Sequence, residues 1–140
     1  MNIRIMPMSF LDFEFIGKDI NYVQEHFFMK DLIEVNKGWY YYGKSGLDAN
    51  EGDLLLFQMN NSIIASALLD DIIQFSKPTI DGNNGTYIIN RRSLKIFKPI
   101  DKAELHKLIP TFTEFGRINQ KFREEDIELK LLNERMNNCD

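Results

Sequence analysis

The sequence predicts one α+β domain, a small β-barrel or strongly bent sheet with flanking helices that include a C-terminal helical segment. Strand-type patterns fill the middle of the chain, and apolar residues recur at helical spacing towards both of its ends. The length of 140 residues is typical of one domain with a single core. We expect a strand-rich core over residues 1–100 and C-terminal helices over residues 101–137, an order that favours α+β over a parallel βαβ arrangement.

The first part of the chain predicts strands followed by a helix. Apolar and polar residues alternate in two short runs, which indicates one or two half-buried strands. The alternating apolar residues are Ile3 and Ile5, then Leu11, Phe13 and Phe15. After Gly17, Asp19 is suited to cap a helix whose apolar residues recur at helical spacing and which should end near Leu32.

An aromatic run and a hairpin define the centre of the chain. Residues 38–53 read GWYYYGKSGLDANEGD, in which the aromatic residues predict a short strand and the glycines predict a loop after it. Two apolar runs, residues 52–59 and 62–75, are separated by Asn60 and Asn61. That separation is the signal of a tight β-hairpin.

The last third predicts a strand region and then helices. A turn cluster from Pro78 to Gly85 precedes one bent strand or two strands, which Pro99 should end. Asp101 should cap a short helix that runs through Lys107 and stops before Pro110. Beyond this point, helical spacing of apolar residues predicts two more helices joined near Glu124. These residues are Phe112, Phe115, Ile118, Phe122, Ile127, Leu131 and Leu132.

Charge and cysteine content limit the classes of function. The net charge is −4, with 17 Lys and Arg against 21 Asp and Glu, so a nucleic-acid surface must be a local basic patch on an acidic body. Cys139 is the only cysteine, which excludes an intramolecular disulfide and suits a reducing compartment. No apolar run approaches the ~20 residues of a membrane span. We expect a soluble cytoplasmic protein without a membrane partner.

One motif matches a phosphate-binding loop but fails on its context. Residues 38–45 fit the pattern G-x-x-x-x-G-K-[ST], which would make Lys44 a phosphate ligand and Ser45 a magnesium ligand. A phosphate loop opens directly into a helix, whereas Gly46 and Gly52 break any regular element here. We therefore interpret the stretch as a loop that only spells the motif.

No other enzyme or metal signature stands out. Glu128 and Lys130 imitate the acidic-x-lysine core of metal-dependent nucleases, but the helical periodicity around them places them on different faces of a helix. His26 and His106 have no neighbouring ligand residues at metal-binding spacing, and the G-x-S-x-G pattern is absent. We expect no cofactor, no metal and no catalytic residue, which favours a non-enzymatic protein.

Aromatic and cationic residues coincide in two stretches, and they are the candidate ligand-binding residues. They are Trp39, Tyr41 and Lys44 in the aromatic stretch, and Asn90, Arg91 and Arg92 on the later strand. Aromatic faces stack bases, and arginine side chains hold phosphate or a guanine edge. The alternative is that the aromatic residues are core packing and that Arg91 and Arg92 form a solvated turn.

The alternation of a strand divides the aromatic run into two pairs. Trp39 and Tyr41 share one face of such a strand, and we expect them to border a cleft. Tyr40 and Tyr42 share the other face, and we expect them to pack in the core.

A further pattern extends from about Asp31 to Ile73. An aromatic strand and a polar loop precede Gly52-Asp53, which opens an apolar strand containing Phe57, and the next strand carries the small residues 65–67. This order resembles the PUA-like superfamily of PUA, ASCH and EVE domains. The resemblance implies a small pseudo-barrel whose cleft accepts RNA or a modified, flipped-out base.

The chain also departs from one branch of that superfamily. The ASCH signature Gly-x-Lys-x-x-Thr-x-Arg is absent, because Gly43-Lys44 leads into Ser45-Gly46-Leu47. This departure argues against ASCH-like hydrolytic chemistry.

The leading hypothesis is a non-enzymatic PUA-like module that recognises RNA or a modified nucleobase in a small cleft. The first alternative is a protein-interaction module that uses an amphipathic C-terminal helix, because many large apolar residues recur there. The apolar residues in question are Phe112, Phe115, Ile118 and Phe122. A weaker alternative is an ASCH-like nucleoside hydrolase in which Lys44 acts with Asp53 or Asp70.

Overall fold

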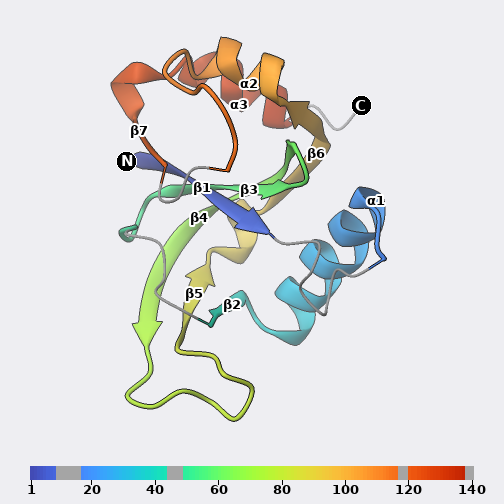
Figure 1. Ribbon diagram of the computed structural model, residues 1–140, viewed down its shortest axis with the longest axis vertical. Coiled ribbons are helices and arrows are strands. Elements are labelled where there is room, and N and C mark those ends of the chain that lie inside the picture. Colours follow the sequence, from blue (N-terminus) through green and yellow to red (C-terminus); the bar gives the residue numbers. More distant parts are fainter. Residues whose placement is uncertain (9–16, 44–48, 117–119, 138–140) are drawn as a thin grey trace.

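The computed structural model of the protein describes residues 1–8, 17–43, 49–116 and 120–137. These residues form a mixed α+β structure around a seven-stranded sheet (Figure 1). The strands are β1 (Asn2–Met8), β2 (Trp39–Tyr42), β3 (Leu54–Met59), β4 (Ser62–Gln74), β5 (Gly85–Ile89), β6 (Lys95–Asp101) and β7 (Lys121–Arg123). The sheet follows the order β2-β5-β4-β3-β1-β7, and β6 pairs with β4. The end strands β2 and β7 are not paired with each other, so the expected α+β class is confirmed but a closed barrel is not formed.

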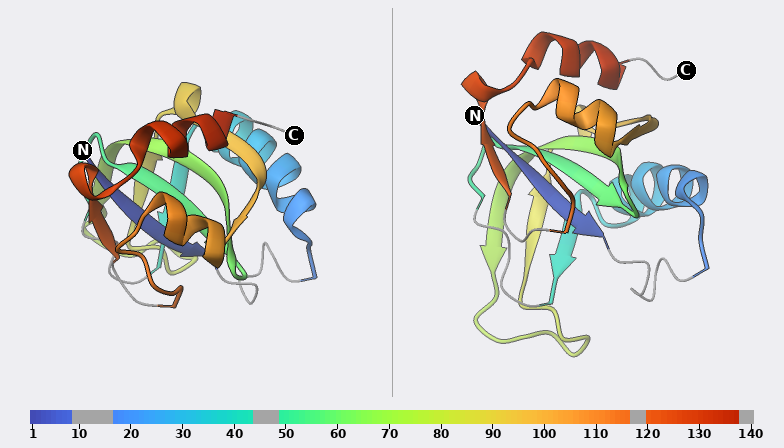
Figure 2. Two further views of the ribbon diagram at one scale, coloured as in Figure 1. Left: turned by 90° about the horizontal axis from the view of Figure 1, so that it is seen from above. Right: turned by 45° about the horizontal axis from the view of Figure 1, so that its top comes forward.

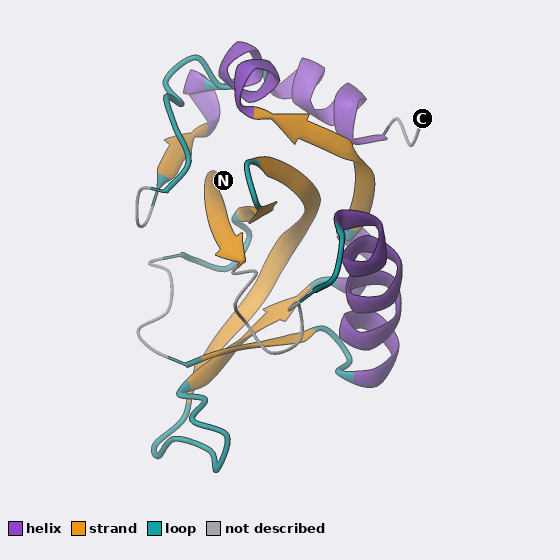
Figure 3. Ribbon diagram, turned by 45° about the vertical axis from the view of Figure 1, so that its right-hand side comes forward, coloured by secondary structure: helices purple, strands orange, loops and turns teal. Residues whose placement is uncertain are grey.

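The long strand β4 organises the sheet. Its first half pairs with β3 on one side and β6 on the other, and its second half pairs with β5. The ladder register shifts in all three pairings, and such bulges bend a strand. Figure 3 shows β4 as a long curved strand that continues away from the helices. The expected hairpin is confirmed, with Asn60 at φ +58° in the turn between β3 and β4.

One face of the sheet is covered by the first helix. Asp19 caps α1 (Ile20–Tyr22) as expected, because its carboxylate accepts from the Tyr22 N–H at 2.8 Å. The helix continues as η1 (Val23–Val35), a π-helix that ends three residues beyond the expected Leu32. The Gln24 side-chain amide donates to the carbonyls of Ile64 (2.9 Å) and Phe97 (2.7 Å), which joins this helix to β4 and β6.

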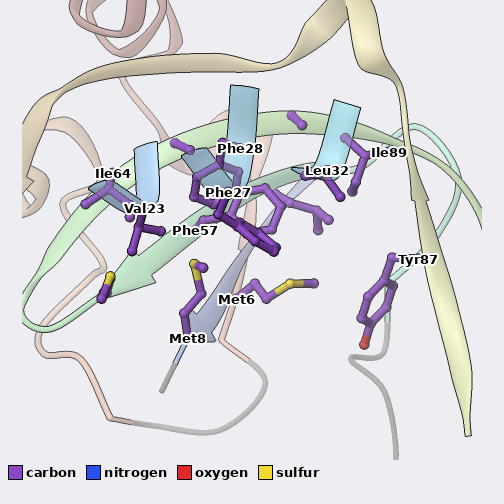
Figure 4. Packing of buried hydrophobic residues seen from close by; sticks show 14 of the residues in the cluster. Met6, Met8, Val23, Phe27, Phe28, Leu32, Phe57, Ile64, Tyr87 and Ile89 are labelled. Atoms are coloured by element: carbon purple, nitrogen blue, oxygen red, sulfur yellow. The ribbon is translucent and has the colours of Figure 1, made fainter. Parts of the chain in front are cut away.

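The first hydrophobic cluster lies between η1 and the sheet. Figure 4 shows the helix residues pointing towards side chains from β1, β3, β4 and β5. The buried residues of η1 include Val23, Phe27, Phe28 and Leu32. Their spacing of four or five residues suits the wider turn of a π-helix.

The second cluster covers the opposite face, beneath α2 (Lys102–Leu108) and α3 (Leu129–Asn137) (Figure 2). Asp101 caps α2 as expected, with its carboxylate 2.8 Å from the Glu104 N–H. Arg135 of α3 binds the Glu104 carboxylate at 2.6 Å and donates to the Lys98 carbonyl at 2.7 Å. These contacts fasten α3 to α2 and β6. No helix in the described part of the chain is long and apolar enough to cross a membrane.

Three expectations for the second half of the chain are wrong in detail. Asn90, Arg91 and Arg92 do not lie on a strand, because the 3-10 turn η2 (Arg91–Ser93) separates β5 from β6. Pro99 does not end the strand, since β6 runs to Asp101.

The third wrong expectation is a helix that begins at Phe112. The described residues between Phe112 and β7 form no helix. β7 forms instead, followed by the 3-10 turn η3 (Glu124–Asp126), because Phe122 pairs with Ile3 at the edge of the sheet. Ile118 and the alternating residues Leu11, Phe13 and Phe15 lie outside the described residues.

Candidate functional site

Strand β2 has two chemically different faces. Tyr40 and Tyr42 pack against the first cluster, so the expectation that they belong to the core is confirmed. The Tyr40 ring centroid lies 5.8 Å from that of Phe27 and 5.6 Å from that of Phe57, and the Tyr42 centroid lies 4.9 Å from that of Tyr87. These contacts anchor β2 at the end of the sheet.

Trp39 and Tyr41 occupy the opposite face of β2. Their ring centroids are 6.1 Å apart, and the Tyr41 centroid lies 6.4 Å from that of Phe75, just after β4. We call Trp39, Tyr41 and Phe75 the aromatic row. Tyr41 is 42% exposed, while Trp39 and Phe75 are half-buried. The row therefore offers ring surface to solvent on a rigid sheet.

A tight approach of the backbone brings Arg91 to the Trp39 end of this row. Gly38 has φ +88°, and a Cβ there would lie 2.6 Å from the Ile89 carbonyl oxygen and 3.2 Å from Arg91 Cγ. Only glycine fits this position, and the Arg91 side chain lies against the residue that precedes Trp39. Lys37, which precedes Gly38, and Arg92, which follows Arg91, are also exposed. Arg91 therefore lies at the Trp39 end of the aromatic row, and two more exposed cationic residues adjoin Gly38 and Arg91 in the sequence.

The other expected site residues have different outcomes. The Asn90 side-chain oxygen accepts from the Arg92 and Ser93 N–H groups at 3.0 and 3.2 Å, so it caps the turn that carries both arginines. Asn90 is therefore placed to position Arg91 rather than to offer this oxygen to a ligand. Lys44 lies outside the described residues.

Asp53 and the segment after the phosphate-loop motif, which suggested enzymatic chemistry, have structural roles. Asp53 is 4% exposed, and its carboxylate accepts from the Asn2 N–H (3.1 Å) and the Asn50 N–H (2.9 Å). This carboxylate ties β1 to the turn before β3. A phosphate-binding loop would be followed by a helix. The described residues that follow the motif, 49–59, form a turn and strand β3 instead. Among the described residues, no three His, Cys, Asp or Glu side chains gather to hold a metal ion.

A separate pocket lies on the second-cluster side of the sheet, and sequence reasoning missed it. It has a volume of about 260 Å³ and lies between β4, β6 and α3. Its polar lining includes Ser66, Lys95 and Asn133, and its apolar lining includes Leu54, Leu68 and Met136. The one sequence signal was a serine between two alanines in an apolar run, because a polar residue on a buried strand face needs a partner.

The aromatic row and this pocket lie on the same face of the sheet. Tyr40, Tyr87 and Ile72 are in register and pack on the first cluster, so the neighbouring row of Trp39, Ile88 and Asp71 faces the other way. Farther along β4 and β3, that other face carries the second cluster. The face is therefore buried at one end and exposed at the other.

Comparison with known proteins finds no matching family model, no matching curated protein and no matching solved structure. A function for the chain is therefore argued from its own geometry.

Proposed function

We propose that this protein is a non-enzymatic binding module that recognises an unpaired base of RNA, or a modified nucleobase, on the outer face of β2. The observation that carries the proposal is the aromatic row, which faces away from the core with Arg91 at its Trp39 end. Stacking of one base on an aromatic side chain contributes about 1–3 kcal/mol to binding. The flanking cations supply attraction for the phosphate backbone.

The electrostatics of this face favour a short ligand. Lys37, Arg91 and Arg92 are exposed cationic residues that flank Gly38 and the η2 turn, on a chain whose net charge is −4. Asp71 lies in the same ladder row as Ile88 and Trp39, so a carboxylate stands on this face two strands from the indole. A carboxylate accepts hydrogen bonds from the N–H groups of a base but repels phosphate. The arrangement suits one or two nucleotides better than a long backbone.

The PUA-like resemblance belongs to the same proposal. Gly52 has φ +90°, and its N–H donates to the Leu69 carbonyl at 2.8 Å, so Gly52-Asp53 opens β3 through a turn that favours glycine. This feature supports the resemblance. The open sheet weighs against it, because the superfamily is expected to form a pseudo-barrel.

Trp39 is the only tryptophan, so its fluorescence reports directly on this face. We expect a short single-stranded RNA or a modified nucleoside to quench Trp39 emission. Arg91→Gln should weaken the RNA binding, whereas Lys98→Gln, an exposed cation on β6, serves as the matched control and should leave it unchanged. Absence of quenching by both probes would refute the proposal.

The protein-interaction alternative loses the observation that motivated it. Phe112 and Phe122 are buried in the second cluster, and Phe115 packs partly buried against it. On α3, Leu132 and Met136 are buried in the same cluster. These described apolar groups pack within the chain, while Ile118, the fourth residue of this hypothesis, lies outside the described residues.

A further inference from the structure

We infer that the pocket between β4, β6 and α3 binds a small monocarboxylate that carries an apolar group. Ser66 on β4 and Lys95 on β6 are direct partners in the antiparallel register, so both side chains rise from adjacent positions on one face. Asn133 contributes from α3, which lies over this face. Polar groups from β4, β6 and α3 thus line one volume of about 260 Å³.

Ser66 supplies a hydrogen-bond donor to the pocket. The residue is 1% exposed, and its hydroxyl has no hydrogen-bond partner among the described residues. The nearby Ser93 contrasts with it, because its hydroxyl donates to the Asn90 carbonyl at 2.7 Å and accepts from the Leu68 N–H at 2.8 Å. The Ser66 hydroxyl faces the pocket, so it is free to donate a hydrogen bond to a bound acceptor.

Lys95 fixes the charge of the ligand. Within the described part of the chain its ammonium group makes no ion pair, and no carboxylate lines the pocket. Met1 also lines the pocket, but its N-terminal ammonium lies 3.8 Å from the Glu124 carboxylate, so Lys95 is the lining cation without a carboxylate partner among the described residues. A carboxylate accepts several hydrogen bonds at once, which allows it to bind Lys95, the Ser66 hydroxyl and the Asn133 amide together.

The apolar residues of the lining determine which group the carboxylate should carry. Leu54, Leu68 and Met136 form apolar walls, which favour a hydrocarbon group attached to the carboxylate. The volume is at the low end for ligand pockets, so the hydrocarbon group must be short. A phosphate dianion fits less well, because Lys95 is the only described lining cation without a carboxylate partner and much of the lining is apolar. The inference is independent of the aromatic row and of base recognition.

The test is a calorimetric titration with hexanoate and with 1-hexanol, which share a six-carbon chain but differ in charge. Met1 lines the pocket, so the chain is used with its N-terminus untagged. Hexanoate should bind at least tenfold more tightly than 1-hexanol. Lys95→Met should reduce hexanoate affinity at least tenfold and bring it to the level of the alcohol. Lys98→Met, on the same strand but outside the pocket lining, should bind as the parent does.

Two further variants locate the site without reference to Lys95. Ser66→Ala and Asn133→Leu should each weaken hexanoate binding several-fold, and hexanoate should shift the amide resonances of Ser66 and Lys95 but not that of Trp39. Equal affinity for hexanoate and 1-hexanol, unchanged affinity in Lys95→Met, or no binding at millimolar hexanoate would each overturn the inference.

Discussion

At the scale of single residues, the two faces of β2 give opposite mutational expectations. Tyr40 packs against Phe27 and Phe57, so Tyr40→Ala removes a ring from the first cluster and should destabilise the fold by about 3 kcal/mol. Trp39 lies on the outer face, and Trp39→Ala should change stability much less. Thermal unfolding of both variants gives the comparison. A lower melting temperature for Trp39→Ala than for Tyr40→Ala would make Trp39 the core residue.

Arg4 is the most unusual buried residue. It is 2% exposed, and its Nε and one terminal nitrogen have no hydrogen-bond partner among the described residues. Its register neighbours are apolar Leu55 on β3 and cationic Lys121 on β7, and neither can accept a hydrogen bond from its side chain. Buried N–H groups without an acceptor destabilise a folded state.

Replacing Arg4 should therefore stabilise the protein. Arg4→Met keeps an unbranched side chain and removes the charge and its unpaired N–H groups, and we expect it to raise the free energy of unfolding by about 1–3 kcal/mol. Urea denaturation of the variant and the parent measures the difference. Lys121→Met, which changes an exposed neighbour, controls for a general effect of lost charge. A destabilised Arg4→Met would show that the guanidinium has an anionic partner.

At the scale of elements, the end of the chain is part of the core. β7 pairs with β1, and α3 places Leu132 and Met136 in the second cluster. Truncation after Pro110 should therefore abolish cooperative unfolding and the near-ultraviolet circular dichroism of packed aromatic residues. A truncated chain that stays folded and monomeric would instead make the C-terminal segment a detachable interaction element.

Elements defined by local signals were predictable from the sequence. The caps at Asp19 and Asp101 and the Asn60-Asn61 turn depend on residues within four positions of each other, and all three are confirmed. β7 was not predictable, because its pairing of Phe122 with Ile3 joins the two ends of the chain. Helical spacing in residues 112–122 was outweighed by burial of Phe112 and Phe122 against the sheet.

In the candidate site, too, features set by local sequence were predictable and features set by strand pairing were not. The separation of Trp39 and Tyr41 from Tyr40 and Tyr42 follows from strand alternation and was predicted. The contact of Arg91 with Gly38 depends on how β2 pairs with β5, which the sequence does not specify. The pocket of Ser66 and Lys95 requires the register of β4 with β6 and the position of α3, so no local pattern could identify it.

At the scale of the whole molecule, one face of the sheet is buried at one end and exposed at the other. Helices α2 and α3 cover one end of this face, and strand β2, which carries Trp39 and Tyr41, lies at the other end (Figures 1 and 2). The first helix covers the opposite face and holds β2 in place through Tyr40. The fold therefore presents aromatic side chains on a strand that its other face anchors to the core, and we propose that they recognise a base.

The salt dependence of RNA binding, measured by Trp39 fluorescence in the parent and in Arg91→Gln, tests that claim most directly. Contacts between cations and phosphate make the logarithm of the affinity fall linearly with the logarithm of the salt concentration. We predict a measurable slope for the parent and a slope shallower by about one in Arg91→Gln, because one phosphate contact is lost. Quenching that is independent of salt, or identical slopes in the two proteins, would contradict the account.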